Sequence, residues 1–299
     1  MLKGFAITPP VVGRISIGRV VEKNGKRLPE KDDQFTITTQ VQNRDGWILH
    51  PAHEAQIKAS QTNKLRSIQV MLPFNDPDLN LRAEYVQFNR EDGRPLSTSD
   101  GVTCRRRTGQ GVQTVTCADT EDCCLRFADT KPYGRLYVKI GGKDDLGTFI
   151  FRTTSYNSIR TLAARMRYYA AVSGGLLAAM PLELKLRGKS TAQSFRTPIY
   201  YVDLVVRAGM TVEEAIQEAR RIDAQRQEAG YDQAALDEAA RLGFGNGSFE
   251  ETEEDLPAVA EEFFPEQSGE ELAPPAGHPQ TGSHSLADKL KAKEEKAAA

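Results

Sequence analysis

Alternation of apolar and polar residues runs through most of the first 154 residues, and it limits the fold more than any other feature. The apolar positions include Ile15 and Ile17 in "GRISIGRVV", and Phe35 and Ile37 in "DQFTITTQV". A two-residue period places one face of a β-strand in a core. Further segments rich in β-branched and aromatic residues are "SIQVML", "LRAEYVQF", "RLYVKI" and "TFIFRTT", separated by turn signals such as "NRDG" and "EDGRP". We therefore expect this half of the chain to be β-rich.

A change to helical periodicity predicts one central amphipathic helix over residues 156–173. Its apolar positions recur every three or four residues, at Ile159, Leu162, Ala163, Met166, Tyr169 and Ala170. Asn157 or Ser158 is the expected N-cap, and Gly174–Gly175 is the expected end. The later "LELKLR" and "PIYYVDLVVR" are expected to be strands, whereas "NDPDLN" is expected to be a loop because Pro77 and two Asp residues interrupt it.

Two further helices are expected near the C-terminus. "TVEE" is a capping box, in which Thr211 and Glu214 each satisfy a backbone N–H of the other. A last helix runs from Asp232 to Gly243. Both are rich in Ala, Glu and Arg, so we expect them at the periphery. The fold class is thus α+β, with a β-rich core, one central amphipathic helix and peripheral C-terminal helices.

The end of the chain differs in charge from the rest. Residues 250–299 contain 13 acidic and 4 basic side chains, a net charge of −9, and the remainder carries +7. This segment is rich in Gly, Pro and Ser and cannot bury enough apolar surface to offset its ordering entropy. Acidic residues alternate there with Leu256, Val259 and Phe263, so the tail could dock on a partner, cover the protein's own basic surface or only aid solubility. The predicted parts are a β-rich core (1–210), a helical extension (211–243) and a disordered acidic tail (244–299).

The composition bounds the class of protein. With 39% hydrophobic and 27% charged residues, the chain has the balance of a soluble protein. No segment approaches the roughly 20 apolar residues of a membrane helix, and the N-terminus lacks the features of a signal peptide. We therefore expect a cytoplasmic location. A basic body with an acidic tail is common among proteins that contact nucleic acid, although ordinary scatter in charge would also produce it.

All four cysteines lie in "CRRRTGQGVQTVTCADTEDCC". Disulfides are rare in the cytoplasm, and this segment is too polar to bury four thiols as ordinary core residues. Thiolates are soft ligands that suit tetrahedral zinc, so we expect a zinc-stabilised loop. The expected ligands are Cys104, Cys117, Cys123 and Cys124. Adjacent cysteines seldom bind one ion, so Asp119, Asp122, Asp129 or a distant His is an alternative fourth ligand, and incidental thiols are the alternative to zinc.

Three basic segments are candidates for contacts with nucleic acid or a partner. Arginine forks suit phosphates, and aromatic rings beside cations suit base stacking. The ordinary alternative for each segment is a solvated basic face. The candidate residues are Arg105, Arg106, Arg107, Arg152, Arg160, Arg165, Arg167, Tyr168, Lys185, Arg187 and Lys189.

A histidine pair offers a third possibility. His50 and His53 in "LHPAHEA" have H-x-x-H spacing, and Glu54 could be a general base for a metal-dependent hydrolase. However, Pro51 interrupts the pair and the HExxH pattern is absent. The more ordinary expectation is two surface histidines near Trp47.

Several segments together resemble one known family. They are "GRISIGRVVEKNGKRLPEKDDQFTITTQV", "RSIQVMLPFND", the cysteine cluster followed by "KPYGRLYVKI", "LGTFIFRTTSYNSIRTLAARMRYYAAVSGGLLAAMPLELKLRGKS" and "TPIYYVDLVVR". They are similar to the recombination directionality factor-like family of phages and integrative elements. The resemblance covers roughly residues 1–210, and Gly147–Arg187 is its most specific part. Thr130 stands where relatives are expected to carry a Cys, so either Cys124 replaces that ligand or the site is incomplete.

The resemblance implies a function without catalysis. Such factors bind a serine integrase on DNA and favour excision over integration, and the family also implies zinc binding. The expected role is therefore that of a non-enzymatic accessory factor in site-specific DNA recombination. The alternatives are a single-stranded nucleic-acid-binding protein of a mobile element and, less favoured, the metal-dependent hydrolase suggested by some relatives' labels, "hydrolase or metal-binding protein".

Overall fold

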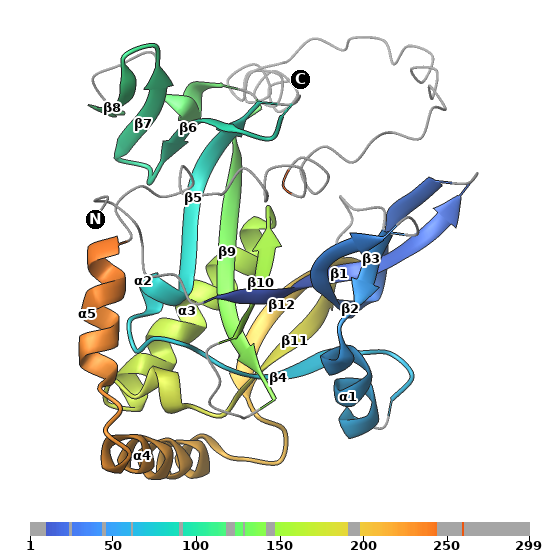
Figure 1. Cartoon of the computed structure of the whole chain (residues 1–299), viewed down its shortest axis with the longest axis vertical. Coiled ribbons are helices and arrows are strands. Elements are labelled where there is room, and N and C mark those ends of the chain that lie inside the picture. The colour runs from blue at the N-terminus through green and yellow to red at the C-terminus, as the bar shows by residue number, and fades with distance from the viewer. Residues whose placement is uncertain are drawn as a thin grey trace, which may run out of the picture. The chain divides into compact units, whose positions relative to one another are not determined.

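The computed structural model describes residues 10–23, 26–43, 46–60, 62–89, 92–117, 123–127, 129–141, 147–190, 198–243 and 259 (Figure 1). All of them lie in one compact unit, Met1–Pro265. The strands are β1 (Val11–Lys23), β2 (Lys26–Asn43), β3 (Gly46–Leu49), β4 (Ser67–Met71), β5 (Leu81–Phe88), β6 (Pro95–Ser99), β7 (Thr103–Thr108), β8 (Gly111–Thr116), β9 (Lys131–Ile140), β10 (Thr148–Thr153), β11 (Leu182–Lys189) and β12 (Ile199–Val206). The helices are α1 (Pro51–Ser60), α2 (Pro77–Asn80), α3 (Tyr156–Val172), α4 (Val212–Glu228) and α5 (Gln233–Gly243), with 3₁₀ helices η1 (Cys124–Arg126) and η2 (Leu177–Ala179).

Strand β9 organises the sheet. It pairs with β10 on one side and β5 on the other, and its last residues pair with β4 (Figure 1). One path through the sheet runs β3-β2-β1-β10-β9-β5-β6-β7-β8, and β4 leads to β11 and β12. The pair β1–β10 is parallel, whereas β9 and its three partners are antiparallel. The predicted α+β class is confirmed.

Helix α3 covers one face of this sheet, and the main core lies beneath it. Leu162 and Met166 on α3 are fully buried in one cluster with Leu136 of β9 and Phe151 of β10. Gly134 of β9 permits this close contact, because a Cβ there would lie 2.8 Å from Ile159 of α3. The predicted amphipathic helix is therefore present and central.

The same helix also covers the edge strand β12. The backbone N–H of Val202 donates to Ser158 Oγ at 3.1 Å, so a strand edge that could recruit another chain is occupied. Asn157 and Ser158 lie within α3, which begins at Tyr156, so neither residue is the N-cap. The cap is Ser155, whose backbone is extended and whose side chain accepts the N–H of Ser158.

The two C-terminal helices pack on the same compact unit. Thr211 and Glu214 form the capping box that the sequence predicts. Ala215 and Ala219 of α4 belong to the main core, and Ala240 of α5 packs with Phe74 and Leu79. The division into core, extension and tail remains a prediction, and the tail lies outside the described residues except for residue 259.

Two helices were not expected. "NDPDLN" contains α2, which Asp76 caps by accepting the N–H of Asp78, and Pro77 occupies the first turn. Helix α1 begins at Pro51 and has no fully buried residue. In both helices a proline near the start was the available sequence signal. For α1 this signal was not enough, because the helix has only a weak apolar pattern.

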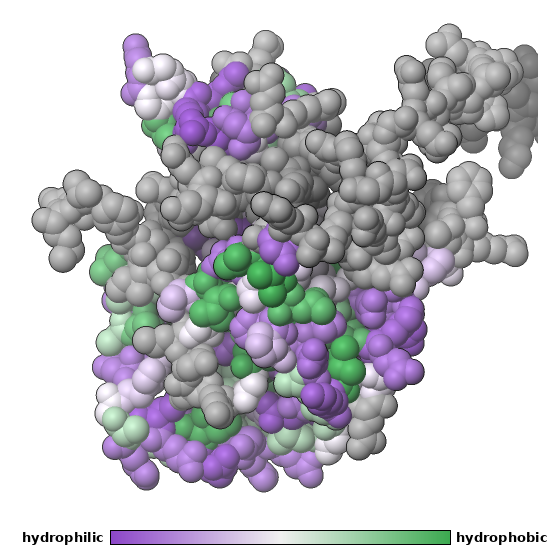
Figure 2. Space-filling model, turned by 45° about the vertical axis from the view of Figure 1, so that its right-hand side comes forward, coloured by the Kyte–Doolittle hydropathy of each residue, from purple (hydrophilic) through white to green (hydrophobic). Residues whose placement is uncertain are grey.

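One face of the molecule carries both polar and apolar described side chains. Figure 2 shows hydrophilic side chains over much of one face, with hydrophobic side chains gathered in smaller areas between them. Among the described residues, no helix is both long and apolar enough to cross a membrane.

Candidate metal centre

The cysteine-rich segment is largely a β-hairpin, although the sequence suggested a loop. Strands β7 and β8 pair from Thr103–Thr116 to Thr108–Gly111, and β7 also pairs with β6. Asp100 orders the turn before β7, because its carboxylate accepts the N–H groups of Val102 and Thr103 at 2.8 and 2.7 Å. Every residue of β8 is exposed, so the hairpin contributes few apolar contacts of its own.

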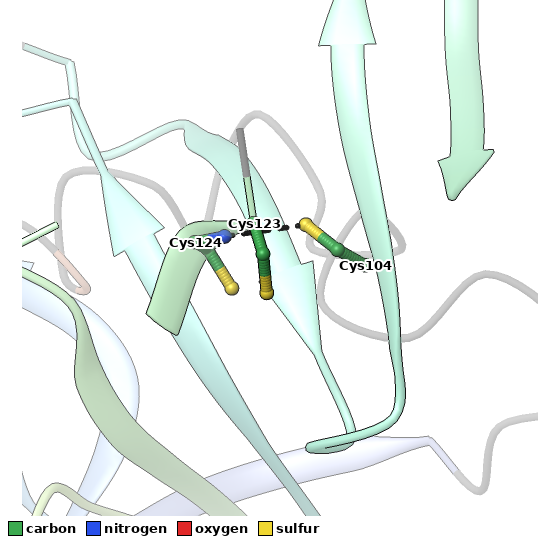
Figure 3. Close-up of side chains that lie close together, drawn as sticks. All are labelled: Cys104, Cys123 and Cys124. Atoms are coloured by element: carbon green, nitrogen blue, oxygen red, sulfur yellow. Dashed lines mark hydrogen bonds between the residues drawn. The ribbon is translucent and has the colours of Figure 1, made fainter. Parts of the chain in front are cut away.

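Three cysteines converge beside this hairpin. Cys104 comes from β7, and Cys123 and Cys124 come from the start of η1 (Figure 3). Their sulfur atoms all lie within 4.8 Å of one another, and the three residues are at most 1% exposed. We call them the cysteine triad. The adjacent cysteines Cys123 and Cys124 thus both contribute to the triad, although neighbouring cysteines seldom bind one ion.

Hydrogen bonds and burial shape the chemistry of the triad. The backbone N–H of Cys124 donates to Cys104 Sγ at 3.4 Å (Figure 3). Burial and the neighbouring thiols raise the pKa of Cys124 to about 12. Burial also opposes ionisation of the Cys123 thiol. Hydrogen bonds, chiefly from the Cys117 thiol and the Leu125 N–H, outweigh the effect of burial and lower the pKa of Cys123.

These features fit a soft divalent cation. Sulfur ligands lie about 2.3 Å from zinc, so two tetrahedral ligands are roughly 3.8 Å apart, within the spread of the triad. Backbone N–H groups directed at sulfur stabilise thiolates, and a bound cation removes the penalty that burial imposes on three neighbouring anions. The triad could therefore hold a metal ion.

The candidates for a fourth ligand fall in different places. Cys117 follows β8 and packs against the triad, and its Sγ lies 3.2 Å from Ser99 Oγ. Asp129 instead accepts the side-chain amide of Gln87 at 3.2 Å. Asp119 and Asp122 lie outside the described residues. Ser99 carries no local sequence signal for this site, because the pairing of β6 with β7 places it opposite Cys104.

The hairpin arginines are on a strand, with different surroundings. Arg105 pairs with Glu84 at 3.3 Å and is partly buried. The guanidinium of Arg106 lies 5.7 Å from the centre of the Phe127 ring, and Arg107 is exposed. The three side chains therefore do not form one uniform array.

The basic residues of α3 and β11 form a second group. The buried Asp203 carboxylate accepts Arg165 Nε at 3.1 Å and Arg187 Nε at 3.3 Å. Two other members of the group form longer ion pairs, Arg167 with Asp78 at 3.5 Å and Lys185 with Glu183 at 3.9 Å. The remaining members are exposed: Arg160, Tyr168 and Lys189. In the sheet, β6, β5, β9 and β4 separate β7 from β11, so the structure does not join this group to the hairpin arginines.

The two histidines have structural contacts. His50 Nδ1 accepts the N–H of Ala52 at 3.1 Å, and its ring packs edge-on against Phe149. His53 Nδ1 accepts the N–H of Ile37 at 3.4 Å. Burial lowers the pKa of both residues. They are partly buried rather than surface histidines, and each has one ring nitrogen engaged by the backbone.

Comparison with known proteins places the chain in a family. The Gp3-like model, described as recombination directionality factor-like, matches residues 12–207. This range contains the cysteine triad, α3 and nearly all of β1 to β12. No curated protein and no solved structure matches the chain. Because the family model covers more than half of its length, the protein belongs to the Gp3-like, recombination directionality factor-like family.

Proposed function

We propose that this protein is a non-enzymatic accessory factor that binds a serine integrase on DNA and biases it toward excision. The observation that carries the proposal is the family match, which spans nearly all of the sheet and the triad. Such a factor needs no bond chemistry. It acts by binding one arrangement of the recombinase–DNA assembly better than another, and about 1.4 kcal/mol of preference changes a ratio tenfold.

We propose zinc as the ion at the triad, with Cys117 as the fourth ligand. Cys117 supports this because its thiol hydrogen-bonds to Cys123 and packs against the triad. Zinc would supply no catalytic chemistry with four protein ligands. The residues themselves would join β7 to η1 and hold the exposed hairpin rigid, which matters because β8 buries none of its side chains.

The surroundings of the basic residues support different roles for them within this proposal. Asp203 offsets the charge of Arg165 and Arg187, so these two are better suited to a protein partner than to phosphate. Arg160 and Lys189 are exposed and remain the stronger phosphate contacts in that group. Of the three hairpin arginines, Arg107 is exposed, whereas Arg105 and Arg106 are partly buried.

The proposal is tested by an assay that scores excision against integration with purified integrases. The double variant Arg106→Gln/Arg107→Gln should reduce the bias toward excision about tenfold. The matched control is Arg221→Gln, because Arg221 is an exposed arginine of α4 bound to Glu218 within the same helix. A protein that binds no integrase and does not alter the ratio would contradict the proposal.

A single-stranded nucleic-acid-binding role is the second candidate. Tyr156 and Tyr168 of α3 are 57% and 50% exposed, and Arg160 lies one turn after Tyr156. Exposed aromatic rings beside a cation suit base stacking. Salt-dependent binding of oligonucleotides without integrase, lost in Tyr156→Ala/Tyr168→Ala, would favour this role over the first.

A further inference from the structure

One row of arginines crosses three neighbouring strands. Arg135 of β9 is directly opposite Arg82 of β5 on one side and Arg152 of β10 on the other. Directly opposite residues point to the same face of a sheet. We call these residues the arginine row. Gly134 faces α3, so the row faces away from α3, because successive side chains alternate.

An apolar cluster adjoins the row on the same face. Phe88 and Tyr133 pack edge to face with ring centres 5.2 Å apart, and Val86 completes this part of the cluster. The Arg135 guanidinium lies 5.7 Å from the centre of the Tyr133 ring. The fourth member is Val259, which is far away in the sequence and 0% exposed.

The sequence around Val259 is complementary in charge to the row. Residues 250–271 carry ten acidic side chains and no basic one. Like charges directly opposite in a sheet repel one another and destabilise the fold. Carboxylates close to the three arginines of the row would offset this repulsion and stabilise the folded state. Val259 is therefore buried in the cluster that adjoins the arginine row, and the segment on either side of it in the sequence is acidic.

We propose that this face is an anion-binding surface, that residues 250–264 of the same chain occupy it with Val259 as the anchor, and that DNA phosphates compete for it. Competition between the segment and DNA rests on the proposed function, which includes DNA contact. Docking of the segment on the arginine row does not depend on that function. The two ligands are mutually exclusive because both require the arginine row. Docking therefore lowers DNA affinity, and by linkage DNA displaces the segment.

Docking is tested in the full-length protein with a photo-crosslinking amino acid in place of Ala260. The expected adducts fall in peptides of β5 and β9, and Val259→Asp should reduce their yield at least tenfold. Val41→Asp is the matched control, because Val41 is 60% exposed and its substitution should leave the yield unchanged. Adducts that fall elsewhere, or a yield that Val259→Asp does not change, would overturn the proposal.

Competition is tested by binding of a labelled duplex DNA at low salt. Val259→Asp should raise the affinity about tenfold, and Arg82→Gln/Arg152→Gln should remove that gain. Added DNA should also reduce the crosslinking yield. The competition would be overturned if Val259→Asp had the same affinity for DNA as the unsubstituted protein and if added DNA left the crosslinking yield unchanged. Neither result bears on the recombination role, which the excision assay tests separately.

Discussion

The region under α3 and the region around the cysteines gain their order in different ways. Under α3, the fully buried side chains of Leu162, Met166 and Leu136 belong to one large apolar cluster. Around the cysteines, the buried group is small, with three thiols and partly buried Tyr85 and Cys117. The free energy gained from apolar burial is proportional to the apolar area removed from water. That area is large in the first region and small in the second. The difference shows why a polar hairpin would need metal ligands.

The largest expected effect tests this dependence directly. Removing the zinc proposed for the triad with a chelator should unfold the β7–β8 hairpin locally while the α3 region stays folded. Structural zinc contributes on the order of 10 kcal/mol in small domains, so the local loss should be several kcal/mol. Hydrogen exchange resolved by peptide measures both regions at once.

The matched control for this test is Cys104→Ser, which should bind less zinc and should respond little to the chelator. Equal protection of the hairpin with and without metal would show that the comparison between the two regions is wrong.

The second prediction addresses the apolar region. Leu162→Ala removes a fully buried side chain and should lower the free energy of unfolding by about 2–5 kcal/mol, measured by urea denaturation. Zinc content of the folded protein should not change. Val172→Ala is the control on the same helix, because Val172 is 37% exposed and should have a much smaller effect. Loss of zinc from folded Leu162→Ala would show that the regions are coupled.

The third prediction concerns the ionic contact between α3 and the β11–β12 pair. Asp203→Asn keeps the shape of the side chain but removes the charge that Arg165 and Arg187 share. We expect a loss of about 1–2 kcal/mol in unfolding free energy, because the carboxylate is buried although both arginines are half exposed. Asp78→Asn, at an exposed pair with Arg167, should change it by less than about 0.5 kcal/mol.

The smallest expected effect lies at the turn before the hairpin. Hydrogen bonds from the Thr103 N–H, the Val102 N–H and the Thr103 hydroxyl lower the pKa of Asp100 and outweigh the opposing effect of desolvation. The folded state therefore favours the ionised carboxylate. Its stabilisation is complete above the unfolded pKa near 3.8 and is lost as the pH falls through the lower folded value.

Asp100→Asn should accordingly lower the unfolding free energy by about 0.5–1 kcal/mol at pH 6. Urea denaturation from pH 6 to pH 3 should show the difference from the unsubstituted protein shrinking below pH 4. A constant difference across this range would remove the assigned role of the carboxylate.

Much of the fold could be predicted from local pattern. The alternation at Ile15 and Ile17 and the helical spacing around Leu162 report burial on one face, and burial determines both strands and α3. The capping box at Thr211 was equally local. The N-cap of α3 was not predicted, because the sequence does not show which nearby serine lies just before the first helical residue. Helix α1 was not predicted, because it buries too few apolar residues to give a helical hydrophobic pattern.

The candidate site was predictable only in part. Four cysteines within 21 residues indicated a metal site, but their spacing could not show that adjacent Cys123 and Cys124 both face Cys104. Similarly, three basic segments were visible, yet the carboxylate of Asp203 that binds two of their arginines lies 38 residues from Arg165 in the sequence.

The sequence by itself determined the α+β class, the position of the central helix and the family, because hydrophobic period and residue order are local properties. Only the tertiary structure decided that Cys104 meets the Cys123–Cys124 pair, that Asp203 holds Arg165 and Arg187, and that Arg82, Arg135 and Arg152 form one row. Each of these follows from strand register or helix packing. Those are set by the burial of the whole core, and no short stretch of sequence contains that information.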